Sequence, residues 1–179
     1  LGNVLRGLVE AYTSIVKYME MHMIVDVWAQ VTTARFAGQP WLKTLWKWTG
    51  REGDPQPTSV EKTVAAMDRA GVDVSLISAW SSPTGDLISN SELQEQVSEA
   101  PDRLRGLATI DLTDPMGAVR EIRRVADGKR IVGVRVVPWL WDLPPNDRRY
   151  YPVYAACIEA GVPFCTQIGH TGPLKRSET

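Results

Sequence analysis

The sequence predicts an α/β fold with a parallel sheet, and three observations support this prediction. Short apolar runs alternate with helical patterns at a spacing of roughly 30 residues, which favours parallel strands joined by right-handed crossovers. The runs are apolar nearly throughout, as expected of strands with both faces buried. No run leads into a Gly-x-Gly-x-x-Gly or phosphate-binding loop, which favours a (β/α)8 barrel over the nucleotide-binding open sheets.

An apolar stripe at helical spacing precedes the first strand. It predicts an amphipathic helix within residues 1–22. The segment lacks the basic start and the unbroken apolar middle of a signal peptide. It is either a helical extension packed on its own domain or upstream sequence outside that domain, and a short self-association helix is the alternative. The stripe consists of Leu1, Leu5, Leu8, Tyr12, Ile15 and Met19.

The strand and helix pattern occupies the rest of the chain, and local signals bound its helices. Thr58 or Ser59 caps the first helix and Gly71 ends it. Pro101 stops the second helix, and Pro115 opens the third. The predicted strands are 23–30, 72–78, 105–112, 131–137 and 162–168, and the predicted helices are 58–71, 89–100, 115–127 and 149–161.

Bulk composition excludes several classes of function. The chain is 44% hydrophobic and 23% charged with a formal net charge of −1, so it lacks the basic excess of a nucleic-acid-binding protein. No apolar run approaches the roughly 18 residues that a membrane span needs. Cys157 and Cys165 are expected to be free thiols in a cytoplasmic protein, and a structural disulfide is the alternative.

The carboxyl ends of the predicted strands carry the candidate site residues, because barrels of this type place their chemistry there. Tryptophans at these ends either line a pocket for a flat ligand or cover the barrel mouth as packing. Another tryptophan-rich segment, 36–57, contains glycine and proline breakers. The tryptophans at strand ends are Trp28, Trp80, Trp139 and Trp141, and the polar residues there are Gln30, Asp111, Gln167 and His170.

Several motifs between residues 23 and 179 follow the order found in one known family. They are IVDVWAQ (24–30), MDRAGVD (67–73), RLRGLA (103–108), GVRV (133–136), DRRYYPVY (147–154), EAGVPF (159–164) and GHTG (169–172). Through them the chain resembles the amidohydrolase-related (amidohydrolase 2) family of TIM-barrel metal-dependent hydrolases and decarboxylases, which includes aminocarboxymuconate semialdehyde decarboxylase. The resemblance implies that residues 23–179 form the amino-terminal part of a (β/α)8 barrel, with about five β/α units.

The metal ligands that the resemblance implies are altered in this chain. The family's site, expected to hold a divalent metal such as zinc, begins with a His-x-His pair where this chain has Trp28 and Gln30. Tryptophan is not a metal ligand, and glutamine is a weak one. The histidine expected near the end of the fifth strand is replaced by Gln167. His170 follows three residues later, and since His22 is the only other histidine, one chain cannot form a three-imidazole site.

Carboxylates and chain length complete this comparison with the family. Asp26 and Asp111 are candidate ligands, although Asp26 is expected to be an interior residue or one that supports a ligand position from behind. Eight strands need about 250 residues, and the family's remaining ligands would lie beyond Thr179. An arc of five strands leaves two sheet edges uncovered. We therefore expect a piece of a longer protein, or a homo-oligomer in which a second chain supplies the cover.

Three functional hypotheses follow. The first is a hydrolase or non-oxidative decarboxylase acting on a small carboxylated or aromatic compound. In it His170 moves protons, while Gln30 and Gln167 orient water or substrate. Arg135 grips a carboxylate, with a structural ion pair as the alternative. The second is a degenerate, metal-free member that binds a ligand or a partner, which Trp28 at the ligand position favours. The third is an assembly protein, which rests only on the amino-terminal stripe.

Overall fold

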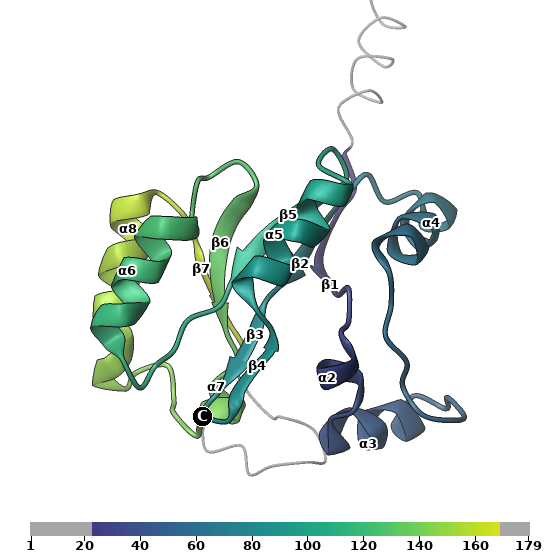
Figure 1. The fold of residues 1–179 in the computed structure, drawn as a ribbon, viewed down its shortest axis with the longest axis horizontal. Helices are drawn as coiled ribbons and strands as arrows, with labels where there is room; N and C mark the ends of the chain where they lie inside the picture. The colour runs from purple at the N-terminus through teal and green to yellow at the C-terminus, as the bar shows by residue number, and fades with distance from the viewer. Residues whose placement is uncertain (1–22, 169–179) are drawn as a thin grey trace, which may run out of the picture.

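The computed structural model describes residues 23–168, a sheet of five parallel strands with helices along one face (Figure 1). The predicted amino-terminal helix and His170 lie outside the described residues. The elements are β1 (Val25–Ala29), α2 (Ala34–Ala37), α3 (Pro40–Trp48), α4 (Val60–Ala70), β2 (Val74–Ser78), β3 (Trp80–Ser82), β4 (Gly85–Ile88), α5 (Asn90–Glu99), β5 (Leu104–Ala108), α6 (Pro115–Val125), β6 (Ile131–Val136), α7 (Pro138–Trp141), the 3-10 turn η1 (Arg148–Tyr150), α8 (Tyr151–Ala160) and β7 (Phe164–Thr166).

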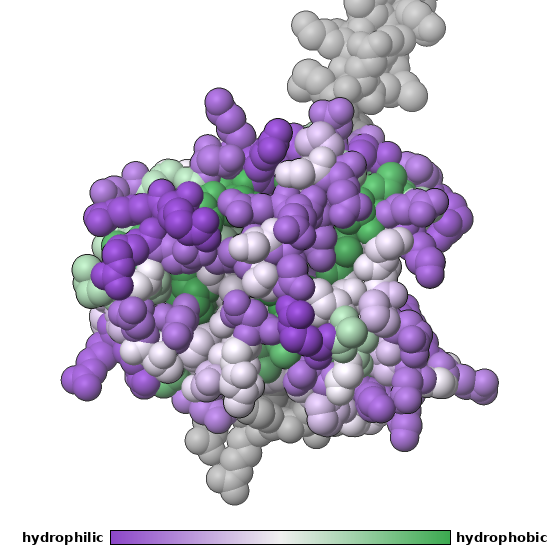
Figure 2. All heavy atoms as spheres, in the orientation of Figure 1, coloured by the Kyte–Doolittle hydropathy of each residue, from purple (hydrophilic) through white to green (hydrophobic). Residues whose placement is uncertain are grey.

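The strands lie in the order β1-β2-β5-β6-β7, and every neighbouring pair is parallel. Helices α4, α5, α6 and α8 cover one face of this sheet (Figure 1). The face seen in Figure 2 is mostly hydrophilic, with apolar side chains confined to small patches. This arrangement confirms the predicted partial (β/α)8 barrel. Within residues 23–168, no helix is long and apolar enough to cross a membrane.

Side-chain caps explain where the helices begin. The Oγ of Ser59 accepts a hydrogen bond from the main-chain N–H of Lys62, and Gly71 ends α4 in the left-handed region at φ 67°. Helix α5 begins with a capping box, in which Ser89 and Glu92 each accept a hydrogen bond from the other's main-chain N–H. Because these signals are local, the sequence predicts both helix starts correctly.

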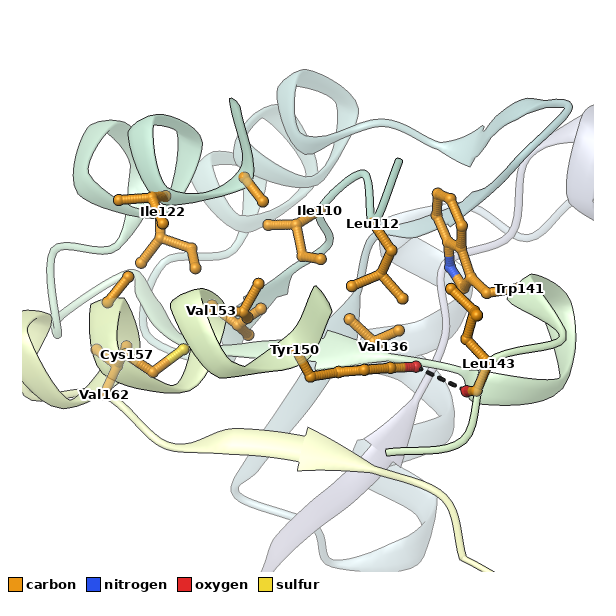
Figure 3. Packing of buried hydrophobic residues seen from close by; sticks show 14 residues of the cluster. Ile110, Leu112, Ile122, Val136, Trp141, Leu143, Tyr150, Val153, Cys157 and Val162 are labelled. Atoms are coloured by element: carbon orange, nitrogen blue, oxygen red, sulfur yellow. Dashed lines mark hydrogen bonds between the residues drawn. The ribbon is translucent and has the colours of Figure 1, made fainter. Parts of the chain in front are cut away.

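Two apolar clusters fill the space between the sheet and its helices. In the cluster of Figure 3, Ile122 of α6 and Val153 of α8 pack near Val136 of β6. Fully buried Tyr150 belongs to this cluster, and its hydroxyl donates a hydrogen bond of 3.1 Å to the carbonyl oxygen of Leu143. A second cluster joins β1, β2 and β5 to α4 and α5. The two clusters hold the helices against one face and leave the other face of the sheet to the site.

The third predicted strand, 105–112, is shorter in the structure because β5 ends at Ala108. The side-chain amide of Asn90 makes two hydrogen bonds with the main chain of Thr109. Its Oδ1 accepts from the N–H of Thr109 and its Nδ2 donates to the carbonyl oxygen, each at 2.9 Å. These two hydrogen bonds occupy the main-chain N–H and carbonyl of Thr109, which therefore do not pair with a neighbouring strand. The antiparallel hairpin of β3 and β4, which the sequence pattern does not predict, follows β2 directly.

Residues 36–57, for which the pattern indicates breakers and no helix, contain the second half of α2 and all of α3. Pro40 occupies the first turn of α3, where a missing N–H costs nothing. No residue of α3 is fully buried, but Trp41 and Leu42 pack against the cluster that contains Phe36 and Trp80. The predicted helix at 149–161 begins as the 3-10 turn η1 and continues as α8.

Replacing Tyr150 with phenylalanine should lower the free energy of unfolding by about 1 kcal/mol, because the carbonyl of Leu143 loses its buried donor. Urea unfolding followed by circular dichroism measures the change. The matched control is Tyr151→Phe, since Tyr151 is 59% exposed and its hydroxyl has no hydrogen bond within the described residues. Equal losses in both variants would contradict a role for this hydrogen bond.

Candidate functional site

The candidate site lies at the carboxyl ends of the parallel strands, where β3, β4, α7, α2 and α3 also gather (Figure 1). Arg135 of β6 is its most buried charged residue, at 4% exposure. Its Nη1 donates to the Oγ of Ser78 at 2.6 Å, and its Nη2 donates to the carbonyl oxygen of Val27 at 2.8 Å. The guanidinium carbon lies 4.0 Å from the ring centroid of Trp28, a cation–π contact. One arginine therefore joins β6 to β2 and β1.

Arg135 has no acidic partner among residues 23–168, and its buried Nε has no hydrogen-bond partner there. Burial lowers the pKa of its guanidinium, because removal from water penalises the charged form. An arginine nevertheless stays protonated in proteins. The site thus holds a buried positive charge with an unused N–H, which an anionic ligand would stabilise.

Gln30 follows β1 and adds further unpaired polar atoms. Its Nε2 and Oε1 are both buried without a partner within the described residues, as is the Oγ1 of Thr166 on β7. Ala29 of β1 pairs with Ile77 of β2, so Gln30 lies beside Ser78 and shares its face of the sheet. Buried polar groups are nearly always hydrogen-bonded, so unpaired ones at strand ends point to a ligand or to water.

Four aromatic side chains, here called the aromatic cluster, gather near the same strand ends. They are Phe36, Trp41, Trp80 and Trp139. Trp41 stacks on Trp80 at a centroid distance of 5.9 Å and meets Trp139 edge-on at 5.1 Å. The indole N–H groups of Trp41 and Trp80 are buried without a partner within the described residues. The cluster therefore combines apolar ring surface with unused donors.

Gln167 links the aromatic cluster to the end of β7. Its Oε1 accepts a hydrogen bond of 2.7 Å from the indole Nε1 of Trp139. β7 pairs with β6 so that Thr166 lies opposite Val136, which places Gln167 just past the strand end. Tryptophans of three different elements and a glutamine thus meet at one edge of the sheet.

The structure brings most of the predicted site residues together. Trp28, Gln30, Trp80, Arg135, Trp139 and Gln167 lie at this edge. Trp141 instead packs with Leu112 and Leu143 in the cluster of Figure 3. Asp26 is exposed among the described residues instead of interior, and its carboxylate accepts from the N–H of Trp28, the residue at the expected ligand position, at 2.8 Å.

Sequence reasoning missed Ser78, Thr166, Phe36 and Trp41 as members of this group. Ser78 ends a predicted strand, and that position alone would have indicated a candidate site residue. Trp41 comes from a segment with no predicted helix, and its contact with Trp80 depends on the tertiary fold.

A hollow of about 230 Å³ lies just past the end of β5 and is lined by residues 109–111, by the hairpin, and by residues at and near the starts of α5 and α6. Asp114 caps α6, and Asp111 accepts hydrogen bonds from the N–H and the hydroxyl of Thr113. A hydrogen bond from Arg124 lowers the pKa of Glu121, against the opposing effect of burial. Most of these carboxylates thus serve the local structure, although Asp111, a predicted strand-end candidate, lines this hollow.

A sequence profile of the family described as amidohydrolase matches residues 25–178. The chain belongs to the amidohydrolase family. The resemblance drawn from the motifs is thereby confirmed. The gamma-resorcylate decarboxylase of Rhodococcus jostii (strain RHA1) is 34% identical over 88 residues, which cover 42% of this chain and 26% of that protein.

Solved structures of low identity share the fold. An uncharacterised TIM-barrel protein from Bordetella bronchiseptica has a TM-score of 0.66 at 22% identity, covering 85% of this chain and 58% of that chain. The 5-carboxyvanillate decarboxylase of Novosphingobium aromaticivorans DSM 12444, solved with manganese and 4-hydroxy-3-methoxy-5-nitrobenzoic acid, has a TM-score of 0.61 at 17% identity, covering 80% and 49%. The chain therefore spans about half the length of these barrel proteins.

The family implies a divalent metal, and three of the similar structures contain manganese. Within residues 23–168, no group of three or more His, Cys, Asp or Glu side chains could hold a metal ion. The polar groups at the strand ends are a guanidinium, amides and hydroxyls, with the positive charge of Arg135 lying over Trp28. This set of donors does not fit a divalent metal.

The two cysteines should react differently with iodoacetamide at pH 8. Burial raises the pKa of the Cys157 thiol to about 11, so only about a thousandth of it is thiolate at that pH. Cys165 is half-buried and lies opposite Arg135 in the pairing of β6 and β7. Mass spectrometry should show one fast label, lost in Cys165→Ser and kept in Cys157→Ser. Fast labelling of Cys157 would contradict its burial.

Proposed function

We propose that the protein is a hydrolase or non-oxidative decarboxylase of the amidohydrolase family, acting on a small carboxylated aromatic compound with an altered metal site. Family membership and the curated decarboxylase relative support the reaction class. The observation that carries the proposal is buried Arg135, which lacks an acidic partner among residues 23–168. A substrate carboxylate would supply that negative charge and accept from the unused Nε–H.

The aromatic cluster and Trp28 would receive the ring of the substrate. Trp28 is 44% exposed and Trp139 is half-buried, so both present ring surface beside the polar groups. Aromatic rings stack favourably on such surfaces. The buried N–H groups of Trp41 and Trp80 would suit oxygen substituents on the ring. Acceptor-rich aromatic acids therefore match the chemistry of the site.

In a decarboxylation, the bond between the ring carbon and the carboxylate breaks and carbon dioxide leaves. The electron pair stays on the ring carbon, which then takes up a proton. We assign the delivery of this proton to His170, because imidazole is the side chain that titrates near neutral pH. Gln30 and Gln167 would orient the substrate through hydrogen bonds, and in a hydrolysis they would orient water.

The alternative is a degenerate, metal-free family member that binds a ligand or a partner without turnover. Trp28 at the expected metal-ligand position favours it, and so does the lack of a metal-binding group among residues 23–168. Under this alternative, the same aromatic acid would bind and leave unchanged. Binding and turnover therefore have to be measured separately.

We further propose that residues 23–179 form the amino-terminal part of a barrel, that residues 1–22 form a helical extension, and that the protein is a cytoplasmic homo-oligomer. Two free cysteines support the reducing compartment. Exposed apolar side chains along β1 support a covering partner. These side chains are Met23, Ile24, Val25, Val27 and Trp28.

Replacing Arg135 with methionine should weaken binding of 2,6-dihydroxybenzoate about tenfold or more, because the carboxylate loses its charged donor. This ligand is bound in one similar decarboxylase structure. Isothermal titration calorimetry measures the dissociation constant. Resorcinol, which lacks the carboxylate, should bind the wild type and the variant equally.

The matched control for that variant is Arg130→Met. Arg130 directly precedes β6, at the other end of the same strand, and is exposed with no side-chain partner within the described residues. Its loss removes the same charge from the chain without touching the site, so affinity should stay unchanged. Equal weakening by both variants would indicate a general charge effect and would contradict the proposed carboxylate grip.

Replacing His170 with alanine should lower the rate of carbon dioxide release about 100-fold, because a positioned general acid is lost. The dissociation constant for 2,6-dihydroxybenzoate should stay within about twofold, since His170 is assigned to proton transfer rather than binding. His22→Ala is the control, and it should leave both quantities unchanged. Binding without any carbon dioxide release by the wild type would instead favour the binding-protein alternative.

A further inference from the structure

We infer that the guanidinium of Arg135, stacked on Trp28, supplies the fixed positive charge at the end of β1 where metal-dependent members of the family hold a metal ion. The inference rests on the proposed function and names the group that replaces the metal in that site. It assigns Arg135 to substrate binding. Besides offering ring surface to the substrate, Trp28 positions Arg135.

Three contacts fix this guanidinium in place. The carbonyl of Val27, one residue before Trp28, accepts from Nη2 at 2.8 Å. Ser78 on β2 accepts from Nη1 at 2.6 Å, and the ring of Trp28 lies beneath the guanidinium carbon at 4.0 Å. Two of the three contacts come from β1 itself. The positive charge is therefore anchored at the positions where the family resemblance places the first metal ligands.

The same geometry disfavours a metal ion there. A divalent cation at the end of β1 would meet a like charge at short range in a partly buried setting, where screening is weak. Gln30 offers one neutral oxygen, and Trp28 offers no donor atom to a metal. The unpaired N–H groups of Arg135 and Gln30 point instead to an anion. A carboxylate bound here would meet the guanidinium directly, without a bridging metal.

Nuclear magnetic resonance of the full chain, labelled with nitrogen-15, tests the inference at the site itself. The Nε–H signal of Arg135 is identified by its loss in Arg135→Lys. Zinc added to about tenfold excess should leave this signal and the side-chain amide signal of Gln30 unmoved, because no metal binds beside them. 2,6-Dihydroxybenzoate should shift both signals.

The outcomes of this titration separate the two proposals. Zinc-dependent shifts of both signals would overturn the inference and restore a metal site at the end of β1. If neither zinc nor the benzoate moves them, the carboxylate site of the proposed function fails while the exclusion of metal stands. Elemental analysis of the same sample counts any zinc that binds elsewhere on the chain.

The role of Trp28 is tested with Trp28→Leu and the conservative Trp28→Phe. In Trp28→Leu, the chemical shift of the Arg135 Nε–H should move toward its ordinary value, because the ring current of Trp28 is lost. Binding of 2,6-dihydroxybenzoate should weaken about threefold to tenfold. Trp28→Phe should retain part of the ring-current effect and most of the affinity. An Arg135 signal that does not change in Trp28→Leu would overturn the stacked pair.

Discussion

Arg135 carries the charge on which the arrangement of the site depends. Its side chain extends from β6 to β2 and β1, where Ser78, the carbonyl of Val27 and the ring of Trp28 hold the guanidinium. A buried charge is costly unless hydrogen bonds or an opposite charge compensate it. These contacts compensate part of the cost and leave the Nε–H unused. The residual cost is what an anionic ligand would remove.

The edge strand β1 shows how this constraint shapes the sheet. Most of its residues are exposed, so apolar burial contributes little to its position. Pairing with β2 fixes one side, supported by the carboxylate of Asp73, which accepts from the N–H of Ile24 at 2.7 Å. The contacts of Arg135 with the carbonyl of Val27 and the ring of Trp28 hold the carboxyl end of β1. The hydrogen bonds of Arg135 thus help to hold β1 in the sheet, whereas the apolar clusters hold the strands that helices cover.

The strand ends collect unpaired polar atoms, whereas the rest of the described structure satisfies most of its own. Gln30, Thr166, Trp41 and Trp80 all have buried side-chain atoms without partners, and each follows, ends or adjoins a strand at the same edge. The acidic hollow beside α5 and α6 contrasts with this, because its carboxylates cap a helix or bind neighbouring side chains. Unused hydrogen-bonding capacity at the first edge marks the place where a ligand would gain most from binding.

The sequence by itself determined the strand and helix rhythm, the barrel class and the helix boundaries at Ser59, Gly71 and Ser89, because periodicity and caps act within a few residues. It also placed Gln30 at a strand end and Arg135 within a strand. Only the tertiary structure decided what Arg135 touches, since its partners Ser78 and Val27 lie 57 and 108 residues away along the chain. Parallel pairing brings such distant strand ends to one edge, and no local pattern encodes which side chains then meet.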